Sequence, residues 1–252
     1  MVENKGKMNS HEEVMTAIRG DTELLTAIPR SFITRDGVEG YRRFVNMKYL
    51  IVTFLILVST GLIVGPVVHA EREIREYQGK PLDPFNREYD NSIRGPQHVD
   101  IETYRLEVTG LVHTPQSLTY QEVLRLPIIK RAVTLYCVEG WDEHLLFEGV
   151  RLADLLALAE PRKGVRTVIF YAADGYSSSL SYDDVIRLDV MLAAKINGRD
   201  LDANRGFPFQ VVAESKLGYK WVKWVTRIEL SENPYKGFWE QRGYDNEADV
   251  KK

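Results

Sequence analysis

Residues 130–141 read KRAVTLYCVEGW. The alternation of apolar and polar side chains predicts a β-strand from Lys130 to Val138, and Gly140 predicts a turn directly after it. Cys137 is the only cysteine in 252 residues, so it has no partner for an internal disulfide. The strand would carry this thiol into the turn, where a cysteine serves as a small buried apolar residue, a nucleophile or a metal ligand.

Short strands and helices alternate along the rest of the chain. Further strands are expected at 104–110, 167–171, 190–196, 209–213 and 222–230, and helices at 118–126 and 152–159. This order predicts the mixed α/β (α+β) class. We expect one main domain over residues 85–252, preceded by a linker at 70–84.

The composition is that of a globular protein, with 44% hydrophobic and 27% charged residues. The formal net charge of -3 provides no basic field of the kind that nucleic-acid binding requires. No nucleic-acid partner is therefore expected.

Common metal and nucleotide motifs are not found in the sequence. The five histidines are His11, His69, His98, His113 and His144, and they show no His-x-x-x-His spacing. With a single cysteine, the chain can hold neither an iron–sulfur cluster with four cysteine ligands nor a haem attached through a Cys-x-x-Cys motif. We expect neither haem, an iron–sulfur cluster nor zinc in this chain.

The stretch Tyr49–Val68 carries no charged side chain. As a helix it would span about 30 Å of hydrocarbon, which predicts a transmembrane anchor or signal at 49–69 that contacts membrane lipid. The basic residues that precede it are Arg30, Arg35, Arg42, Arg43 and Lys48. The positive-inside rule then places residues 1–48 in the cytoplasm and the main domain on the exported, periplasmic side of a single-pass protein.

Arg42 and Arg43 also resemble a twin-arginine export signal, because an aromatic residue and Lys48 follow them ahead of the apolar stretch. Val68-His69-Ala70 is compatible with cleavage after small residues. The apolar stretch is longer than a typical signal core, which favours a retained anchor. Flanking charge and an export signal remain as two interpretations of the arginine pair.

Six blocks of the exported part resemble, in the same order, the molybdopterin domain of the sulfite oxidase family. They are Asn91-Ser92-Ile93-Arg94-Gly95-Pro96, Cys137-Val138-Glu139-Gly140-Trp141, Phe147–Leu156, Ala173–Ser177, Gly206-Phe207-Pro208 and Gly218–Trp224. The resemblance covers about residues 85–244. It implies a sulfite-oxidase-type fold and a molybdenum–molybdopterin cofactor.

In that family one protein cysteine and the two sulfurs of one pterin hold the molybdenum, and Cys137 matches this metal ligand. A thiolate is a soft ligand suited to such a metal, and coordination requires that the cysteine be deprotonated. One cysteine suffices because the cofactor supplies the other sulfurs.

The resemblance also implies contacts to the phosphate and pterin of the cofactor. The matching residues are Asn91, Ile93, Arg94, Asp174, Arg205, Gly218, Tyr219 and Lys220. Backbone N–H groups, cations and amides are what such a ligand needs, and Arg94 would also act on the substrate. Without the resemblance, each would be interpreted as a solvated surface charge or a turn residue.

Tyr176 is a candidate catalytic phenol beside the metal, and a turn tyrosine is the alternative. Glu139 and Asp174 are candidates for proton transfer or, equally, turn and capping residues. Gln210 stands where the family often has arginine, so anion recognition is weakened unless Arg205 replaces that contact.

These features predict a molybdenum oxidoreductase that transfers an oxygen atom with two electrons. The chain ends soon after Trp224 and resembles the single-domain reductase branch, which implies reduction of a sulfoxide. Oxidation of sulfite or a similar small anion is one alternative, and a metal-free, membrane-anchored binding module is another. A separate electron carrier, either a membrane cytochrome or a quinone-linked protein, would be needed.

Overall fold

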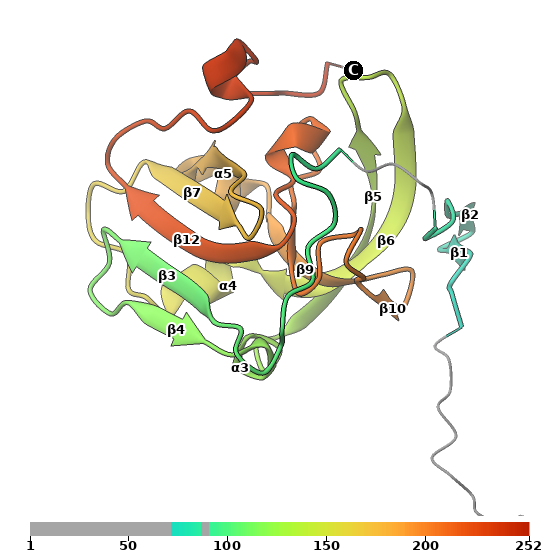
Figure 1. The fold of residues 1–252 in the computed structure, drawn as a ribbon, viewed down its shortest axis with the longest axis horizontal. Coiled ribbons are helices and arrows are strands. Elements are labelled where there is room, and N and C mark those ends of the chain that lie inside the picture. The colour runs from blue at the N-terminus through green and yellow to red at the C-terminus, as the bar shows by residue number, and fades with distance from the viewer. Residues whose placement is uncertain (1–71, 87–90, 252) are drawn as a thin grey trace, which may run out of the picture. The chain divides into compact units, whose positions relative to one another are not determined.

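Two five-stranded sheets dominate the computed structural model, which describes residues 72–86 and 91–251 (Figure 1). The first sheet has the order β10-β9-β6-β5, with β11 also paired to β9. Its strands are β5 (Ile128–Tyr136), β6 (Asp142–Arg151), β9 (Met191–Ile196), β10 (Arg199–Asp200) and β11 (Gln210–Val212). All the pairings in this sheet are antiparallel.

The second sheet has the order β4-β3-β12-β7-β8. Its strands are β3 (Leu106–Gly110), β4 (Gln116–Leu118), β7 (Thr167–Ala172), β8 (Ser177–Ser181) and β12 (Val225–Ser231). The central strand β12 pairs in parallel with β3 and antiparallel with β7. The mixed direction of this sheet follows from the long connection between β3 and β12, which contains the whole of the first sheet.

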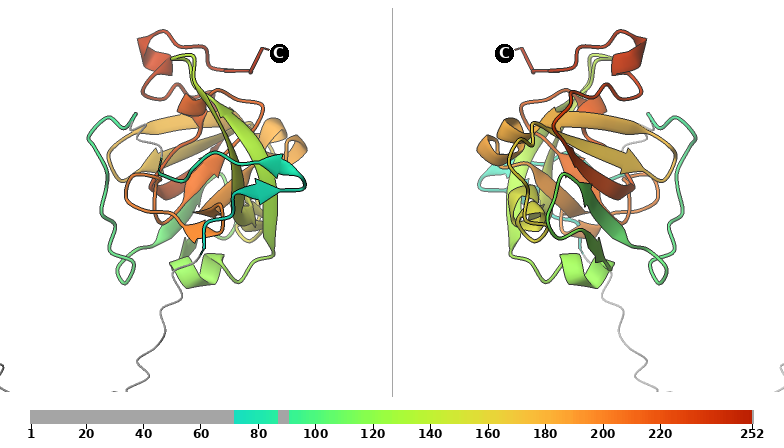
Figure 2. Two further views of the ribbon diagram at one scale, coloured as in Figure 1. Left: turned by 90° about the vertical axis from the view of Figure 1, so that its right-hand side faces the viewer. Right: turned by 90° about the vertical axis from the view of Figure 1, so that its left-hand side faces the viewer.

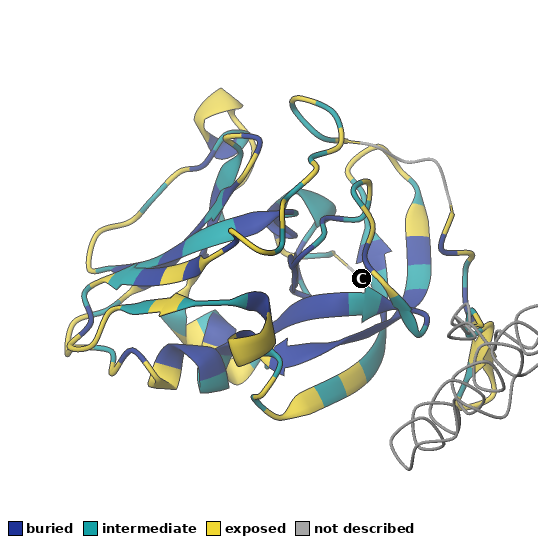
Figure 3. Ribbon diagram, turned by 60° about the horizontal axis from the view of Figure 1, so that its bottom comes forward, coloured by how far each residue is buried: buried dark blue, intermediate teal, exposed yellow. Residues whose placement is uncertain are grey.

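The helices are short. They are α3 (Tyr120–Val123), α4 (Leu152–Ala157) and α5 (Tyr182–Arg187), with 3-10 turns η3 (Gly218–Lys220) and η4 (Glu240–Arg242). Figure 3 shows buried residues concentrated in the strands and exposed residues in the loops. The buried core draws side chains from both sheets, and each fully buried Leu, Val or Phe contributes about 1.5–3 kcal/mol.

The hairpin β5–β6 positions the cysteine. Its register runs from the pair Ile128–Val150 to the pair Tyr136–Asp142, and the turn closes with a 2.9 Å hydrogen bond from the Cys137 N–H to the Trp141 carbonyl. Gly140 allows this turn because its φ is +88°. The turn, η3 and the C-terminal segment that carries η4 lie at one end of the domain, at the top of Figure 1 and of both views in Figure 2.

Most strand predictions are confirmed in position, and the sheet-dominated structure with few helices confirms the mixed class. The helix predicted at 118–126 was wrong in extent. Leu118 belongs to β4, and the helix is confined to Tyr120–Val123 after a capping box between Thr119 and Glu122. Strands β6 and β8 were not predicted, because β6 is mostly buried and β8 consists mainly of serines, so neither shows clear alternation. Helix α5 was not predicted either.

The described part of the segment predicted as a linker at 70–84 is hydrogen-bonded to the domain. It contains the two-stranded pairing β1 (Glu76–Tyr77) with β2 (Lys80–Pro81). The Ile74 N–H donates to the Asn197 carbonyl at 2.8 Å. The predictions for residues 1–48 and 49–69 lie outside the described residues. Within the described ranges, no helix combines the length and apolarity needed to cross a bilayer.

Gly149 is required where β6 and β9 approach each other. A Cβ at this position would overlap the Leu192 carbonyl oxygen, at the register shift between the two strands. We predict that Gly149→Ala lowers the free energy of unfolding by about 1–3 kcal/mol through overpacking. Urea denaturation tests this, with the exposed Ser117→Ala in β4 as a control expected to change it by less than about 0.5 kcal/mol. An equally stable Gly149→Ala variant would contradict this packing.

Candidate active site

A cavity of about 350 Å³ lies at the end of the domain where the β5–β6 turn and η3 meet. Its aromatic lining is Trp141, Tyr176, Tyr219, Trp221, Trp224, Trp239 and Tyr244. Its charged lining is Glu139, Glu143, Asp174, Arg205 and Lys223. The remaining lining residues are Asn91, Ser92, Ile93, Leu135, Cys137, Val138, Gln210 and Gly218. The volume falls in the range of small-molecule and cofactor sites.

Cys137 lies in the cavity wall, partly buried. The Asn91 amide donates to its Sγ at 3.5 Å and to the Glu139 carboxylate at 3.4 Å. Burial is the largest cause of a raised pKa for the Cys137 thiol, and it outweighs the hydrogen bonds that favour the thiolate. The thiol is therefore protonated at neutral pH in the absence of a cation, and metal binding would release its proton.

Arg205 lines the cavity, but its charge is already compensated. Two nitrogens of its guanidinium donate to the Glu143 carboxylate at 2.8 and 3.0 Å, and Nε and Nη2 donate to the Phe85 carbonyl at 3.0 and 2.8 Å. Glu143 is fully buried, so this bidentate pair is screened little by solvent. Because Glu143 and the Phe85 carbonyl hold its guanidinium, Arg205 is not placed to supply the anion contact that an arginine at position 210 would make.

Tyr176 also lines the cavity, and its hydroxyl donates to the Tyr219 carbonyl at 2.6 Å. Burial raises the pKa of Tyr176 well above its usual value, so the phenol stays protonated. Asp174 accepts a 2.8 Å hydrogen bond from the Tyr176 N–H and shapes the turn at this edge. To donate to a substrate oxygen, the Tyr176 hydroxyl would have to give up its hydrogen bond to the Tyr219 carbonyl.

Lys220 does not line the cavity, although Gly218 and Tyr219 do. Its side chain is fully buried, and Nζ donates to the Glu240 carboxylate at 2.6 Å and to the Ser179 carbonyl at 3.0 Å. Burial lowers the pKa of Lys220, and Glu240 opposes that shift. Two residues of η3, Gly218 and Tyr219, therefore line the cavity, while the lysine of the same turn holds the C-terminal segment.

Arg94 lies beside the cavity lining rather than in it. A Cβ at Gly175 would be 3.8 Å from the central carbon of the Arg94 guanidinium, which places Arg94 next to the Asp174 turn. Its neighbours Asn91 and Ile93 are part of the lining. The predicted site residues thus gather at one end of the domain, but Arg94 and Lys220 are not among the residues that line the cavity.

Several lining residues were not predicted from the sequence. Lys223 supplies a cation to the cavity, and its Nζ donates to the Asn204 carbonyl at 2.9 Å. Trp224 follows with φ of +50°, a left-handed conformation that a tryptophan rarely adopts. The Lys-Trp pair that occurs twice, at 220–221 and 223–224, was a usable signal for these residues. Trp239 and Tyr244 had no such signal.

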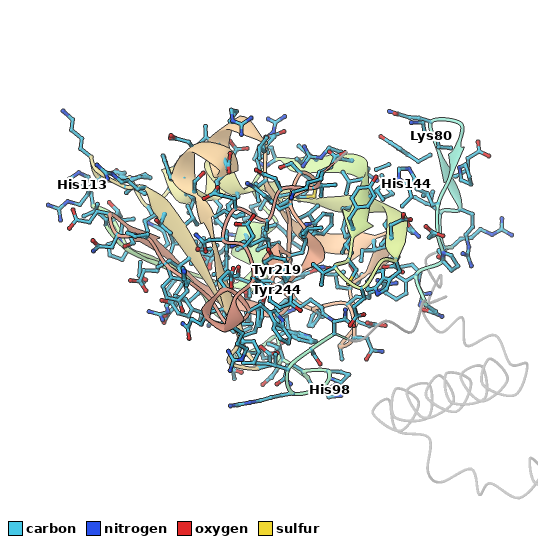
Figure 4. The ribbon with its side chains drawn as sticks, turned by 90° about the horizontal axis from the view of Figure 1, so that it is seen from above. Lys80, His98, His113, His144, Tyr219 and Tyr244 are labelled. Atoms are coloured by element: carbon cyan, nitrogen blue, oxygen red, sulfur yellow. The ribbon has the colours of Figure 1, made fainter. Side chains whose placement is uncertain are left out.

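Histidines do not form a metal site in the part of the chain that the structure describes. Figure 4 shows His98, His113 and His144 at three separate edges of the domain. No group of three or more His, Cys, Asp or Glu side chains in the described ranges could hold a metal ion. A metal at Cys137 would therefore take most of its ligands from a cofactor.

Comparison with known proteins identifies the domain. A family model described as the oxidoreductase molybdopterin binding domain matches residues 93–239. The chain belongs to this family. The described domain is therefore a molybdopterin-binding oxidoreductase domain, which confirms the resemblance seen in the sequence.

Two relatives and one solved structure illustrate this kinship. The uncharacterized oxidoreductase YuiH of Bacillus subtilis is 30% identical over 155 residues, which is 61% of this chain and 78% of that protein. A putative protein-methionine-sulfoxide reductase subunit, YedZ1 of Azospira oryzae, is 32% identical over 163 residues, 64% of this chain and 61% of that protein. The sulfane dehydrogenase SoxCD from Paracoccus pantotrophus superposes with a TM-score of 0.53 at 26% identity, covering 55% of this chain and 41% of that one.

The family implies a molybdenum–molybdopterin cofactor, and the residues of the cavity fit it. Cys137 offers a soft donor at the wall, and the Asn91 amide is placed to stabilise a thiolate. Gly218 and Tyr219 of the η3 turn also line the cavity, where a turn can offer backbone N–H groups to a phosphate. This assignment of residues to the cofactor does not include Arg94 or Lys220.

We predict that Cys137→Ala abolishes turnover while leaving the fold intact, because it would remove the expected metal ligand from a cavity wall rather than a core side chain. Molybdenum content, activity and near-ultraviolet circular dichroism of the full chain measure these effects. Undiminished activity in this variant would exclude Cys137 as the metal ligand.

The buried Lys220–Glu240 pair gives a second prediction. Lys220→Met leaves a buried carboxylate without its cation and should destabilise the domain by about 3–5 kcal/mol. The double variant Lys220→Met/Glu240→Leu should recover most of this loss, because both charges are removed. Urea denaturation measures both effects.

Lys195→Met, which breaks the more exposed pair with Asp200, is the matched control and should cost about 1 kcal/mol or less. If the double variant were as unstable as Lys220→Met, an unpaired charge would not be the cause.

Proposed function

We propose that this chain is a molybdenum–molybdopterin-dependent reductase that removes the oxygen atom from a neutral, oxidised sulfur compound such as a sulfoxide. The observation that carries the proposal is the charge of the cavity. Its lining has the carboxylates Glu139, Glu143 and Asp174 against the cations Arg205 and Lys223, a formal balance of 2 − 3 = −1.

The two cations are also engaged by the protein. Arg205 is paired with Glu143, and Lys223 donates to the Asn204 carbonyl. An anion such as sulfite would enter a site without excess positive charge, whereas a neutral sulfoxide needs none. Aromatic rings make favourable contacts with sulfur, and seven of them line this cavity.

The reaction requires two protons and two electrons: sulfoxide + 2H⁺ + 2e⁻ → sulfide + water. The cofactor, when bound, supplies two-electron transfer of an oxygen atom. Cys137 would hold the metal, and Asn91 would orient the thiolate. Glu139 is exposed at the rim and accepts from the Trp141 indole at 3.1 Å, so it can relay protons from solvent toward the cavity.

The relative YedZ1 supports this direction of reaction by its name, whereas SoxCD is named as a dehydrogenase, which is the direction of the alternative.

For the rest of the chain we propose the membrane arrangement inferred from the sequence. Residues 1–48 would be cytoplasmic, 49–69 would anchor the protein, and the domain would lie on the exported side. A membrane cytochrome or quinone-linked protein would supply electrons.

Steady-state assays on the molybdenum-loaded full chain test the proposal. We expect turnover of methionine sulfoxide with a reduced viologen as electron donor, and no oxidation of sulfite with an artificial acceptor. Sulfite oxidation at a rate matching the metal content, with no sulfoxide reduction, would reverse the assignment. A folded protein without molybdenum, from a host that makes molybdopterin, would favour a binding module.

A substitution of Glu143 tests whether the charge of the cavity excludes anions. Glu143→Gln removes the carboxylate that neutralises Arg205, so we predict that sulfite or sulfate inhibits this variant several-fold more strongly than the wild type. The control is Glu107→Gln, which removes an exposed carboxylate of β3 outside the cavity lining and leaves the Arg205–Glu143 pair in place. Equal inhibition constants in the wild type and Glu143→Gln would contradict a role of the Arg205–Glu143 pair in excluding anions from the cavity.

A further inference from the structure

We propose that Trp239 and Tyr244 select the substrate by its apolar substituent, and that the buried Lys220–Glu240 pair positions them. The selection of an S-oxide rests on the function proposed above. The two rings belong to the segment 232–250 that follows β12, which we call the C-terminal strap.

The strap contributes a continuous aromatic wall to the cavity. The Tyr244 ring lies 5.2 Å from the rings of both Tyr219 and Trp239, between ring centroids. Phe238 continues the series toward Tyr176 at 5.9 Å. Tyr219 and Tyr244 lie next to each other in Figure 4. Trp239 and Tyr244 line the cavity, and Tyr244 is 38% exposed, so the wall extends from the interior to the rim.

The buried charges fix the strap to the body of the domain. Glu240 accepts hydrogen bonds from Lys220 of η3 and from Ser178 of β8, and both Lys220 and Glu240 side chains are fully inaccessible. Breaking such a pair is costly because a charge would remain buried. The pair therefore holds η4, and with it the residues on either side, in one position.

Three further contacts hold the strap along its length. A Cβ at Gly237 would overlap the Ser177 carbonyl oxygen, so the strap backbone packs directly on β8. The Tyr219 hydroxyl donates to the Asp245 carbonyl at 2.6 Å, and Lys216 pairs with Asp249 at 2.7 Å. Burial raises the pKa of Tyr219 to about 12, so this donor is present at neutral pH. The strap is a fixed wall rather than a mobile lid.

The wall is partly outside the region shared with the family. The family model ends at residue 239, so Glu240 and Tyr244 follow its last matched residue. Cys137, Asn91, Trp239 and Tyr244 line the same cavity. An S-oxide whose oxygen met a metal at Cys137 would therefore place its substituent in the cavity that the two rings line. Aromatic rings favour aryl or extended thioether groups through apolar burial and sulfur–ring contacts. The wall thus predicts preference for an S-oxide with a large apolar arm over a small one.

The test compares methyl phenyl sulfoxide with dimethyl sulfoxide on the molybdenum-loaded full chain. Trp239→Ala and Tyr244→Ala should each raise KM for methyl phenyl sulfoxide by about 10-fold or more, with little change in kcat. KM for dimethyl sulfoxide should change little. The matched control is Tyr235→Ala, an aromatic residue of the same strap that is not part of the cavity lining and packs on Tyr171.

The positioning role of the pair is tested by the same ratio of kcat/KM values for the two substrates. Glu240→Ala should lower the preference for methyl phenyl sulfoxide. Glu240→Gln should retain most of it, because the amide oxygen can still accept from Lys220 and Ser178. Loss of both activities in equal proportion in Glu240→Ala would indicate a general structural effect and would overturn the positioning role.

Calorimetric titration with methyl phenyl sulfide separates this inference from the proposed function. We expect Trp239→Ala to bind the sulfide about 10-fold or more weakly than the wild type, and Tyr235→Ala to bind it equally. If the wild type reduced no S-oxide, the reductase proposal would fail, while this titration would still test the wall. Unchanged sulfide binding in both Trp239→Ala and Tyr244→Ala would overturn the wall itself.

Discussion

The antiparallel register between β5 and β6 is the constraint on which the site depends. Nine consecutive residue pairs run from Ile128–Val150 to Tyr136–Asp142, and the turn that closes them carries Cys137. A shift of one residue would turn every side chain of the shifted strand to the opposite face. The buried centre of β6 and the left-handed Gly140 prevent such a shift, so the thiol has one position from which it can meet a metal.

Charge compensation organises the surroundings of that thiol. Arg205 with Glu143 and Lys220 with Glu240 are pairs in which at least one partner is fully buried, and each joins segments far apart in sequence. Such pairs add little net stability compared with apolar packing, but they are costly to break, so they fix which segments meet. The first pair removes free positive charge from the cavity. The second brings the C-terminal strap to its rim.

The sequence predicts those parts of the site that depend on local pattern. Cys137 follows a strand and precedes a glycine, and both signals act over a few residues. Lys220 shows where this reasoning fails. Its position after Gly218-Tyr219 in the family pattern predicted a contact with the cofactor. Instead, the carboxylate of Glu240, 20 residues later in the sequence, pairs with Lys220 in the interior. Strand β8 was missed for a related reason, because its buried serines are satisfied by polar groups of the strap and leave no periodic signal.

The most direct test of the central claim is X-ray absorption spectroscopy at the molybdenum edge on the loaded protein. With Cys137 as a ligand, we predict one more sulfur neighbour around molybdenum in the wild type than in Cys137→Ala, since the cofactor sulfurs are common to both. An identical sulfur shell in the two proteins would contradict the assignment of Cys137 as the metal ligand.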